Sequence, residues 1–406
     1  KLIEYGGLGH SAVIHAEDQE VINHFSNVVK VGRIIVNSPS THGAIGDIYN
    51  TNVPSLTLGC GTFGGNSTTD NVSSVNLINL KRVAKRQVNM QWFKVPPKIY
   101  FEAGSVKYLS KMQGISKAFI VTDQSMLKFG YVDKVIYQLE KRDKPVHYEI
   151  FSDVEPDPSF DTINRGVEFM CSFAPDVIIA IGGGSVIDSA KAIGYGVANG
   201  GDVWDFYSHK RSAAGCLPIG VILTISATGS EMSDSSVITN EDGWIKTGYH
   251  SEYCRPKFAI MNPELTMTLP DYQTACGCTD ILMHTMERYF TQGENMELTD
   301  SIAEALMRTV IENTKILKEN PKDYNARAEV MWAGSLSHNG LTGCGTGGGD
   351  WACHQLEHEL GGVYNVTHGA GLAAIWGSWA RYVYAANPER FAQFATNVFD
   401  IPCCTD

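Results

Sequence analysis

The chain has 406 residues, of which 43% are hydrophobic and 19% are charged, and its formal net charge is −12. This length allows two or three domains with well-packed cores. The acidic balance argues against a nucleic-acid partner, which needs a basic face, and no apolar run reaches the roughly 20 residues of a membrane span. The ten cysteines include no C-x-x-C pair, so we expect free thiols and a reducing, cytoplasmic location.

Residues 1–88 are rich in glycine, serine, asparagine and threonine. Short strands are predicted at 11–15 and 33–37. A basic stretch at 81–86, followed by two prolines at 96–97, predicts a linker. The sequence begins without methionine inside strand-like residues, and we therefore expect it to be part of a longer protein.

Between residues 89 and 270, strands and helices alternate. Continuous runs of apolar and β-branched residues predict strands at 117–122, 176–181 and 218–226. Short strands that are apolar throughout are typical of parallel sheets covered by helices on both faces. This segment is therefore predicted to be a doubly wound α/β domain.

From residue 271 to 406 the pattern is helical. Pro270 and Asp271 predict a helix start, and amphipathic spacing predicts long helices at 298–318 and 326–340. We expect an all-helical domain in this part of the chain.

A run of three glycines, Gly182-Gly183-Gly184, followed by Ser185, comes directly after the strand predicted at 176–181. Glycines let a backbone approach a phosphate closely, and the helix that follows offers free N–H groups and its positive dipole end. The run lacks the third glycine of G-x-G-x-x-G, so it is not the standard dinucleotide fingerprint. It predicts a phosphate-binding turn, and the alternative is a tight strand-to-helix turn without a ligand.

Asp123 ends a predicted strand at the carboxyl edge of the sheet, where ligands of α/β proteins bind. A carboxylate at this place can accept hydrogen bonds from a ribose and would repel a 2′-phosphate, which favours NAD over NADP. The alternative is that Asp123 caps a helix at 124–129.

Asp280 and His284 are four residues apart, so a helix would present both on one face. His354 and His358 repeat this spacing, and His368 follows on a predicted turn. Carboxylate and imidazole ligands suit a divalent first-row metal. Two sets of ligands remain open: Asp280, His284, His354 and His368, or His354 and His358 as the H-x-x-E-H motif of a metallopeptidase. The second set leaves Asp280 and His284 unexplained. Isolated histidines are expected to be structural: His10, His42 and His338.

Several of these motifs occur in the order found in one family. Thr228-Gly229-Ser230-Glu231, the Asp280/His284 pair and the segment from His354 to Gly369 resemble the iron-dependent (group III) alcohol dehydrogenases, over about residues 97–395. The resemblance implies an α/β dinucleotide-binding domain followed by an all-helical metal-binding domain, with the metal in the cleft.

The resemblance also implies roles for individual residues. The implied metal ligands are Asp280, His284, His354 and His368. His358 would be catalytic, beside the substrate and the nicotinamide. The implied cofactor-binding residues are Asp123, Gly183, Gly184, Ser185, Asp188, Thr224, Thr228 and Lys246.

Residues 1–90 resemble a different protein segment. Stretches at 6–10, 54–61 and 64–67 are similar to the end of the CoA-acylating aldehyde dehydrogenase domain of bifunctional aldehyde-alcohol dehydrogenases. We therefore expect an N-terminal remnant of an aldehyde dehydrogenase α/β domain in residues 1–88. The nucleophilic cysteine of that domain would precede residue 1, so this chain would not carry out CoA acylation by itself.

From about residue 200 onward the sequence resembles butanol dehydrogenases of the same superfamily, as in Asp350-Trp351-Ala352-Cys353-His354 and Glu357-His358-Glu359-Leu360. The expected activity is reversible NADH-dependent reduction of acetaldehyde or butyraldehyde to the alcohol, with Fe²⁺, or Zn²⁺, as a Lewis acid. A homo-oligomer that forms helical filaments is the expected assembly. The alternatives are an NADP-linked butanol dehydrogenase and a mainly structural, filament-forming fragment.

Overall fold

The structure is a computed structural model that describes residues 5, 8–45, 82–85, 98–291, 293 and 296–402. The chain divides into two compact units, Lys1–Met90 and Gln91–Asp406. The stretches at 54–61 and 64–67 lie outside the described residues, as does most of the predicted linker. The predicted boundaries at residues 88 and 270 stay predictions.

The first unit contains a three-stranded parallel sheet with two helices. Its elements are β1 (Gly9–Ile14), α2 (Gln19–Val28), β2 (Val31–Val36), α3 (Ser40–Ile45) and β3 (Arg82–Lys85). Asp18 caps α2 by accepting hydrogen bonds from the first backbone N–H groups of the helix. Ile22 of α2 packs against Ile34 of β2 in a small apolar cluster.

The second unit contains a six-stranded parallel sheet with the strand order β4-β11-β8-β7-β5-β6. The strands are β4 (Lys98–Phe101), β5 (Lys117–Thr122), β6 (His147–Phe151), β7 (Val177–Gly182), β8 (Ile219–Leu223) and β11 (Phe258–Met261). Every residue of β7 and β8 is buried. The continuous apolar runs in the sequence therefore belong to central strands of a parallel sheet, as predicted.

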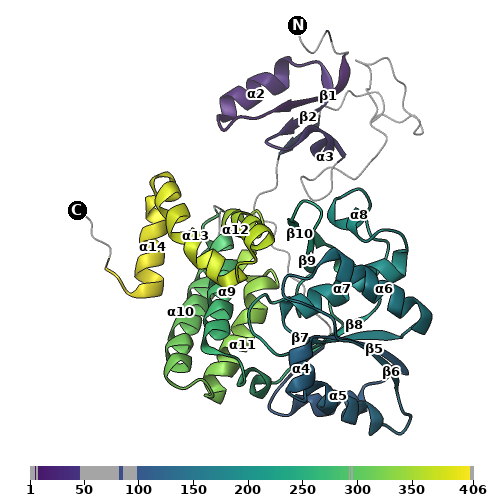
Figure 1. Ribbon diagram of the computed structural model, residues 1–406. Helices are drawn as coiled ribbons and strands as arrows, with labels where there is room; N and C mark the ends of the chain where they lie inside the picture. The colour runs from purple at the N-terminus through teal and green to yellow at the C-terminus, as the bar shows by residue number, and fades with distance from the viewer. Residues whose placement is uncertain are drawn as a thin grey trace. The chain divides into compact units, whose positions relative to one another are not determined.

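Helices cover both faces of this sheet (Figure 1). In β7, Ile178 packs in one apolar cluster with residues of α6 (Phe160–Phe173) and α7 (Gly184–Asn199). Its neighbour Ile179 packs on the opposite face with residues of α5 (Tyr131–Glu140). Alternate side chains of one strand thus enter two cores, which is the arrangement of a doubly wound α/β domain.

Two short helices and an antiparallel hairpin complete the α/β region. They are α4 (Gln124–Lys128), α8 (Trp204–Tyr207), β9 (Ser235–Asn240) and β10 (Ile245–His250). The hairpin packs on α7 and on a helix of the next region, so it connects the sheet with the helical part of the unit.

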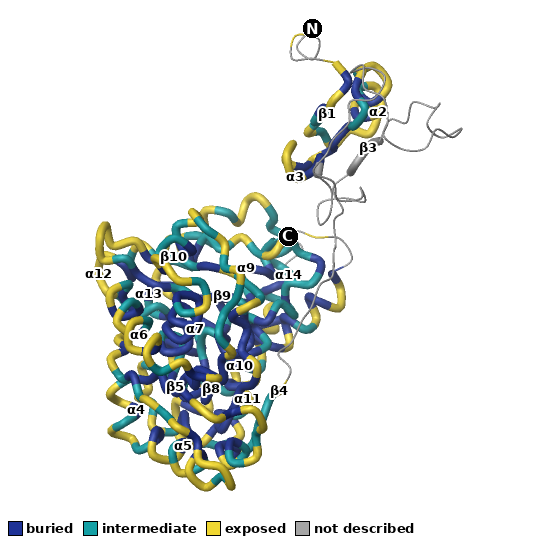
Figure 2. The backbone as a smooth tube through the Cα atoms, turned by 90° about the vertical axis from the view of Figure 1, so that its right-hand side faces the viewer, coloured by how far each residue is buried: buried dark blue, intermediate teal, exposed yellow. Residues whose placement is uncertain are grey.

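The remainder of the described chain is helical: α9 (Asp271–Tyr289), α10 (Glu297–Glu319), α11 (Tyr324–His338), α12 (Ala352–Tyr364), α13 (His368–Val383) and α14 (Pro388–Phe399). α9 packs against α10, α11 and α13, and its middle is buried (Figure 2). It is one continuous helix of 19 residues. Among the described residues, no helix is long and apolar enough to cross a membrane.

Candidate metal centre and cofactor cleft

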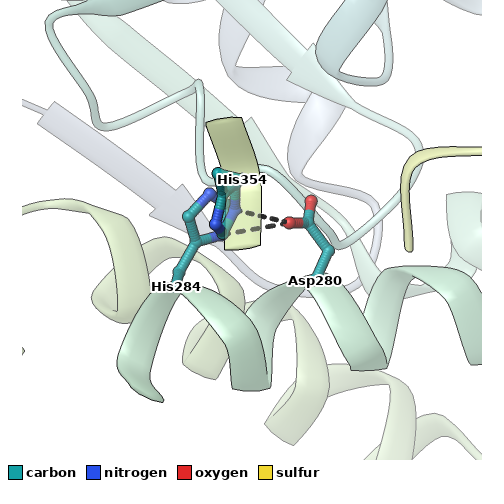
Figure 3. Close-up of side chains that lie close together, drawn as sticks. All are labelled: Asp280, His284 and His354. Atoms are coloured by element: carbon teal, nitrogen blue, oxygen red, sulfur yellow. Dashed lines mark ion pairs between the residues drawn. The ribbon is translucent and has the colours of Figure 1, made fainter. Parts of the chain in front are cut away.

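Asp280 and His284 lie on one face of α9, as their spacing predicts. Both side chains are buried, with exposed fractions of 2% and 3%. Oδ1 of Asp280 lies 3.4 Å from Nδ1 of His284. Figure 3 shows the two side chains rising from the same helix toward a common point.

Two further histidines reach this point from other helices. His354 belongs to the first turn of α12, and its Nε2 lies 3.6 Å from Oδ1 of Asp280 (Figure 3). His368 is the first residue of α13, and its Nε2 lies 3.6 Å from the same oxygen. The structure thus brings all four predicted metal ligands together from three helices.

The donor atoms fit a metal ion. Oδ1 of Asp280, Nδ1 of His284 and Nε2 of His354 are buried without a hydrogen-bond partner, and they lie within 4.8 Å of one another. Buried polar atoms are nearly always satisfied, so such a cluster needs a partner that side chains do not supply. Ligand atoms about 2.1 Å from a tetrahedral ion are about 3.4 Å apart, which agrees with the 3.4 Å and 3.6 Å that separate Oδ1 of Asp280 from the nitrogens of His284 and His354. A divalent first-row ion would satisfy all three atoms.

The charge states of Asp280 and His284 favour metal binding. Burial alone would raise the pKa of Asp280, but His368 and His354 outweigh it, and the pKa is lowered. Burial, helped by the neighbouring His338 and His354, lowers the pKa of His284 well below its usual value. The two groups are therefore in the ionised and neutral forms, respectively, that bind a cation.

Two buried glutamates orient the imidazoles. Oε1 of Glu287 lies 3.0 Å from the backbone N and 3.0 Å from Nδ1 of His354. Glu357 accepts a hydrogen bond from Nδ1 of His368. In both cases Nδ1 is held by a carboxylate, so Nε2 faces Asp280; metal-binding histidines are commonly fixed in this way. These roles are not among the predictions from the sequence, although Glu287 extends the Asp280/His284 spacing by three residues along the same helix face.

His338, expected to be structural, lies against the centre. Its ring stacks on that of His284 with 4.1 Å between centroids. Its Nδ1 lies 2.6 Å from the backbone oxygen of Thr228, and burial, followed by the charge of Arg288, lowers its pKa to about 3. No local pattern could have found this residue, because its neighbours come from distant segments.

His358 lies beside the cluster rather than within it. Its ring centroid is 6.0 Å from that of His368. Burial, with smaller contributions from His368 and Lys246, lowers its pKa to about 3, so the ring is neutral at physiological pH. The metallopeptidase alternative is disfavoured, because the carboxylate of Glu357, which would have to act as its base, is engaged by His368 and Lys246.

The glycine run forms a close contact between β7 and the segment after β8. A Cβ atom on Gly183 would lie 2.1 Å from Cγ2 of Ile225, and one on Gly184 would lie 2.5 Å from Cγ2 of Thr228. Neither position can carry a side chain without a shift of its neighbours. Ile225 and Thr228 thus fill the space beside these two glycines, which is the packing of a tight strand-to-helix turn, and the phosphate-binding role stays a prediction.

Three other predicted cofactor residues surround this turn. Ser185 lies half-buried in the first turn of α7. The backbone N of Thr224 donates to the oxygen of Gly182 at 3.1 Å. Thr228 lies against Gly184. The structure thus brings these residues together at the carboxyl ends of β7 and β8.

The other predicted cofactor residues are engaged by protein groups. Asp188 is buried and accepts hydrogen bonds from Oγ of Ser230 at 2.6 Å and the N of Val237 at 2.9 Å. The ammonium of Lys246 lies 2.8 Å from a carboxylate oxygen of Asp157.

Asp123 follows β5 and caps α4, which was the alternative given for it. One of its oxygens accepts hydrogen bonds from the backbone N atoms of Ser125 and Met126. Asp123 is half-buried and directly follows β5 at the carboxyl edge of the sheet. β5 pairs with β7, the strand that precedes the glycine run.

Two family models match this second unit. The model described as "Iron-containing alcohol dehydrogenase" matches residues 96–263, and the model described as "Fe-containing alcohol dehydrogenase family, C-terminal" matches residues 274–406. The chain belongs to the iron-containing alcohol dehydrogenases. Both the α/β region and the helical region that carries the four clustered ligands belong to this family.

Relatives of this iron-containing alcohol dehydrogenase fall into two groups. The aldehyde-alcohol dehydrogenase of Streptococcus pneumoniae is 37% identical over 98% of this chain and 45% of its own length. NADH-dependent butanol dehydrogenase A of Clostridium acetobutylicum is 39% identical over 76% of this chain and 80% of its own. The chain therefore spans less than half the length of the first relatives, whereas the match to the second covers about three quarters of the chain.

The crystal structure of NADH-dependent butanol dehydrogenase A from Thermotoga maritima superposes on the chain with a TM-score of 0.76. The two are 37% identical, and the match covers 79% of this chain and 80% of the other. The predicted resemblance and the predicted fold, an α/β domain followed by a helical domain, are confirmed.

Proposed function

We propose that this chain catalyses the reversible NADH-dependent reduction of short-chain aldehydes, such as acetaldehyde and butyraldehyde, to primary alcohols. The observation that carries the proposal is the set of unpartnered buried ligand atoms of Asp280, His284 and His354. It lies in an alcohol dehydrogenase of the iron-containing family. Fe²⁺ fits this site, and Zn²⁺ fits the same ligand types.

The residues of the chain supply binding and positioning. A divalent ion held by this site would polarise a carbonyl oxygen and stabilise an alkoxide, while a nicotinamide supplies the hydride. Asp280 would give the ion its one negatively charged ligand, and the neutral histidines would leave it electrophilic. Gly183, Gly184 and the first turn of α7 would hold the cofactor's phosphates. His358 would help to relay the proton that an alcohol loses on oxidation without retaining it, because burial lowers its pKa to about 3.

A preference for NAD over NADP is part of the proposal. The Asp123 carboxylate lies at the carboxyl end of β5, where it would repel a 2′-phosphate. The butanol dehydrogenases to which the chain is similar are named as NADH-dependent, which supports the same preference.

We further propose that the chain is the alcohol dehydrogenase part of a bifunctional enzyme that converts acetyl-CoA to ethanol. The similarity to aldehyde-alcohol dehydrogenases extends over 98% of the chain, and thus includes the first unit. A cytoplasmic location and assembly into filaments stay predictions.

An anomalous-difference map at the iron edge, from crystals grown with Fe²⁺, tests the metal assignment. A peak enclosed by Asp280, His284, His354 and His368 is the expected result, and a peak held by His354 and His358 would overturn the proposal. In solution, His284→Ala should abolish aldehyde-dependent NADH oxidation and leave the circular dichroism spectrum unchanged. The matched control is His147→Ala, which removes an exposed imidazole of β6.

A further inference from the structure

Glu357 carries a charge that the protein must balance. Its side chain is completely buried, and one of its oxygens accepts the hydrogen bond from Nδ1 of His368. A buried carboxylate is strongly destabilising unless a cation or several donors compensate it. His368 alone does not supply that charge when its imidazole is a neutral metal ligand.

Lys246 supplies the missing positive charge from the α/β region. Its side chain is 5% exposed, and its Nζ lies 3.6 Å from Oε2 of Glu357. The same ammonium lies 2.8 Å from Oδ1 of Asp157. Asp157, in turn, adopts a left-handed backbone conformation with φ of 51°, which is uncommon outside glycine, although aspartate tolerates it better than most residues. The four residues form a chain of alternating charges that ends at His368.

The surrounding backbone leaves space for this chain. A Cβ on Gly361 would lie 2.7 Å from Nζ of Lys246, and a Cβ on Gly371 would lie 2.8 Å from Cγ of Glu357. α12 packs directly on β10. A side chain at Gly361 would displace the Lys246 ammonium, and one at Gly371 would displace the side chain of Glu357.

The second glutamate is held differently. Glu287 binds both the backbone N and Nδ1 of His354, and it comes from α9, the helix that also carries Asp280. No described lysine forms an ion pair with Glu287. The imidazole of His354 is therefore held by a glutamate of the helical region, whereas the glutamate that holds His368 lies beside a lysine from β10.

We propose that Lys246 and Asp157 are positioning residues of the metal centre, which act on His368 through Glu357. Lys246 compensates the buried carboxylate, and Asp157 orients Lys246. This inference rests on the proposed function, because it takes His368 as a metal ligand. It gives Lys246 a role different from the cofactor contact that the family resemblance implies, since its ammonium lies within ion-pair distance of two carboxylates.

Zinc affinity, measured by competition with a fluorescent chelator, tests the proposal without relying on turnover. Lys246→Met, which keeps the length of the side chain and removes its charge, should weaken Zn²⁺ binding 10- to 100-fold, the usual effect of losing a residue that supports a metal ligand. Asp157→Asn should weaken it less. Lys210→Met, which removes an exposed lysine 4.0 Å from Asp205, should change nothing.

Double variants show whether Lys246 acts through Glu357. In a Glu357→Gln background the carboxylate charge is absent, so adding Lys246→Met should change zinc affinity less than twofold. In a Glu287→Gln background, adding Lys246→Met should weaken zinc binding by the same factor as in the unmodified chain, because Glu287 holds a different imidazole, that of His354. If Lys246→Met weakens zinc binding by the same factor in the Glu357→Gln background as in the unmodified chain, the proposal is overturned.

A cofactor role for Lys246 gives a different result. Lys246→Met would then raise the dissociation constant of NADH, measured by fluorescence, and leave zinc affinity unchanged, which would overturn the inference but not the proposed function. An unmodified chain that binds neither Zn²⁺ nor Fe²⁺ would overturn the proposed function itself. If Lys246→Met fails to fold, Asp157→Asn carries the test, and zinc affinity equal to that of the unmodified chain would refute the proposal.

Discussion

The glycine turn and the metal centre are built in opposite ways. At the turn, Gly183 and Gly184 bring the backbone against Ile225 and Thr228, where a Cβ atom would not fit. At the centre, histidines of three helices surround Asp280, and the ligand atoms of Asp280, His284 and His354 lack partners. The turn is therefore sensitive to any added atom, whereas the centre should tolerate changes of shape better than changes of charge. The predictions below test this difference, from the largest expected effect to the smallest.

Asp280→Asn should have the largest effect, although it hardly alters the shape of the site. The amide removes the one negative charge among the proposed ligands, and metal catalysis provides several kcal/mol of transition-state stabilisation. We expect kcat/KM for aldehyde reduction to fall about a thousandfold or more, together with the bound zinc measured by elemental analysis. NADH affinity should not change, because the glycine turn is untouched. A variant that keeps both its zinc and its turnover would contradict the ligand assignment.

Asp188→Asn should damage stability rather than chemistry. Asp188 is buried, accepts two hydrogen bonds and lies close enough to the fully buried Lys191 to interact with its charge. An amide at this position removes the charge that faces the ammonium and replaces one carboxylate acceptor by an NH2 group, which should lower the free energy of unfolding by about 1–3 kcal/mol.

Urea denaturation of the metal-free protein measures this effect. The control is Asp153→Asn, which breaks an exposed ion pair with Arg165 and should cost about 0.5 kcal/mol. Equal stability of the two variants would show that the hydrogen bonds from Ser230 and Val237 to Asp188 are not important for folding, and would favour the cofactor role that the resemblance implies.

The sequence allowed prediction of what is local. The apolar run at 117–122 coincides with β5, and the spacing of Asp280 and His284 correctly placed both on one helix face. Periodicity also predicted the helix at 298–318, which the structure extends by one residue at each end.

The sequence could not show contacts between distant segments. His338 lies beside the metal centre and is hydrogen-bonded to the backbone oxygen of Thr228, 110 positions earlier. Glu287 holds the imidazole of His354 across 67 positions, and Lys246 meets Glu357 only because a hairpin packs on α12. Such roles depend on tertiary packing, which propensity and spacing do not encode.

Gly184→Val should have a moderate effect on stability and on NADH binding, whereas Asp280→Asn should act on the metal and on turnover. Its new side chain would meet Thr228 at less than contact distance, and overpacking of this kind typically costs about 1–3 kcal/mol. We expect a lower melting temperature and a higher KM for NADH, with zinc affinity unchanged. Gly215→Ala is the control, because a Cβ at that position meets nothing within 4 Å. An unchanged KM in Gly184→Val would indicate a tight turn without a ligand.

Asp123→Ser should have the smallest effect, and it separates the two interpretations of this residue. Serine can still cap α4, so stability should stay within about 0.5 kcal/mol, while the charge that would repel a 2′-phosphate is lost. We expect the ratio of kcat/KM for NADH to that for NADPH to fall about tenfold, since about 1.4 kcal/mol of discrimination corresponds to that factor. Asp123→Ala removes both the helix cap and the charge, and should lower the free energy of unfolding by ~1 kcal/mol more than Asp123→Ser does. If Asp123→Ser leaves the cofactor ratio unchanged and only Asp123→Ala destabilises the chain, then Asp123 is a helix cap, and the cofactor preference must come from another residue at the carboxyl edge of the sheet.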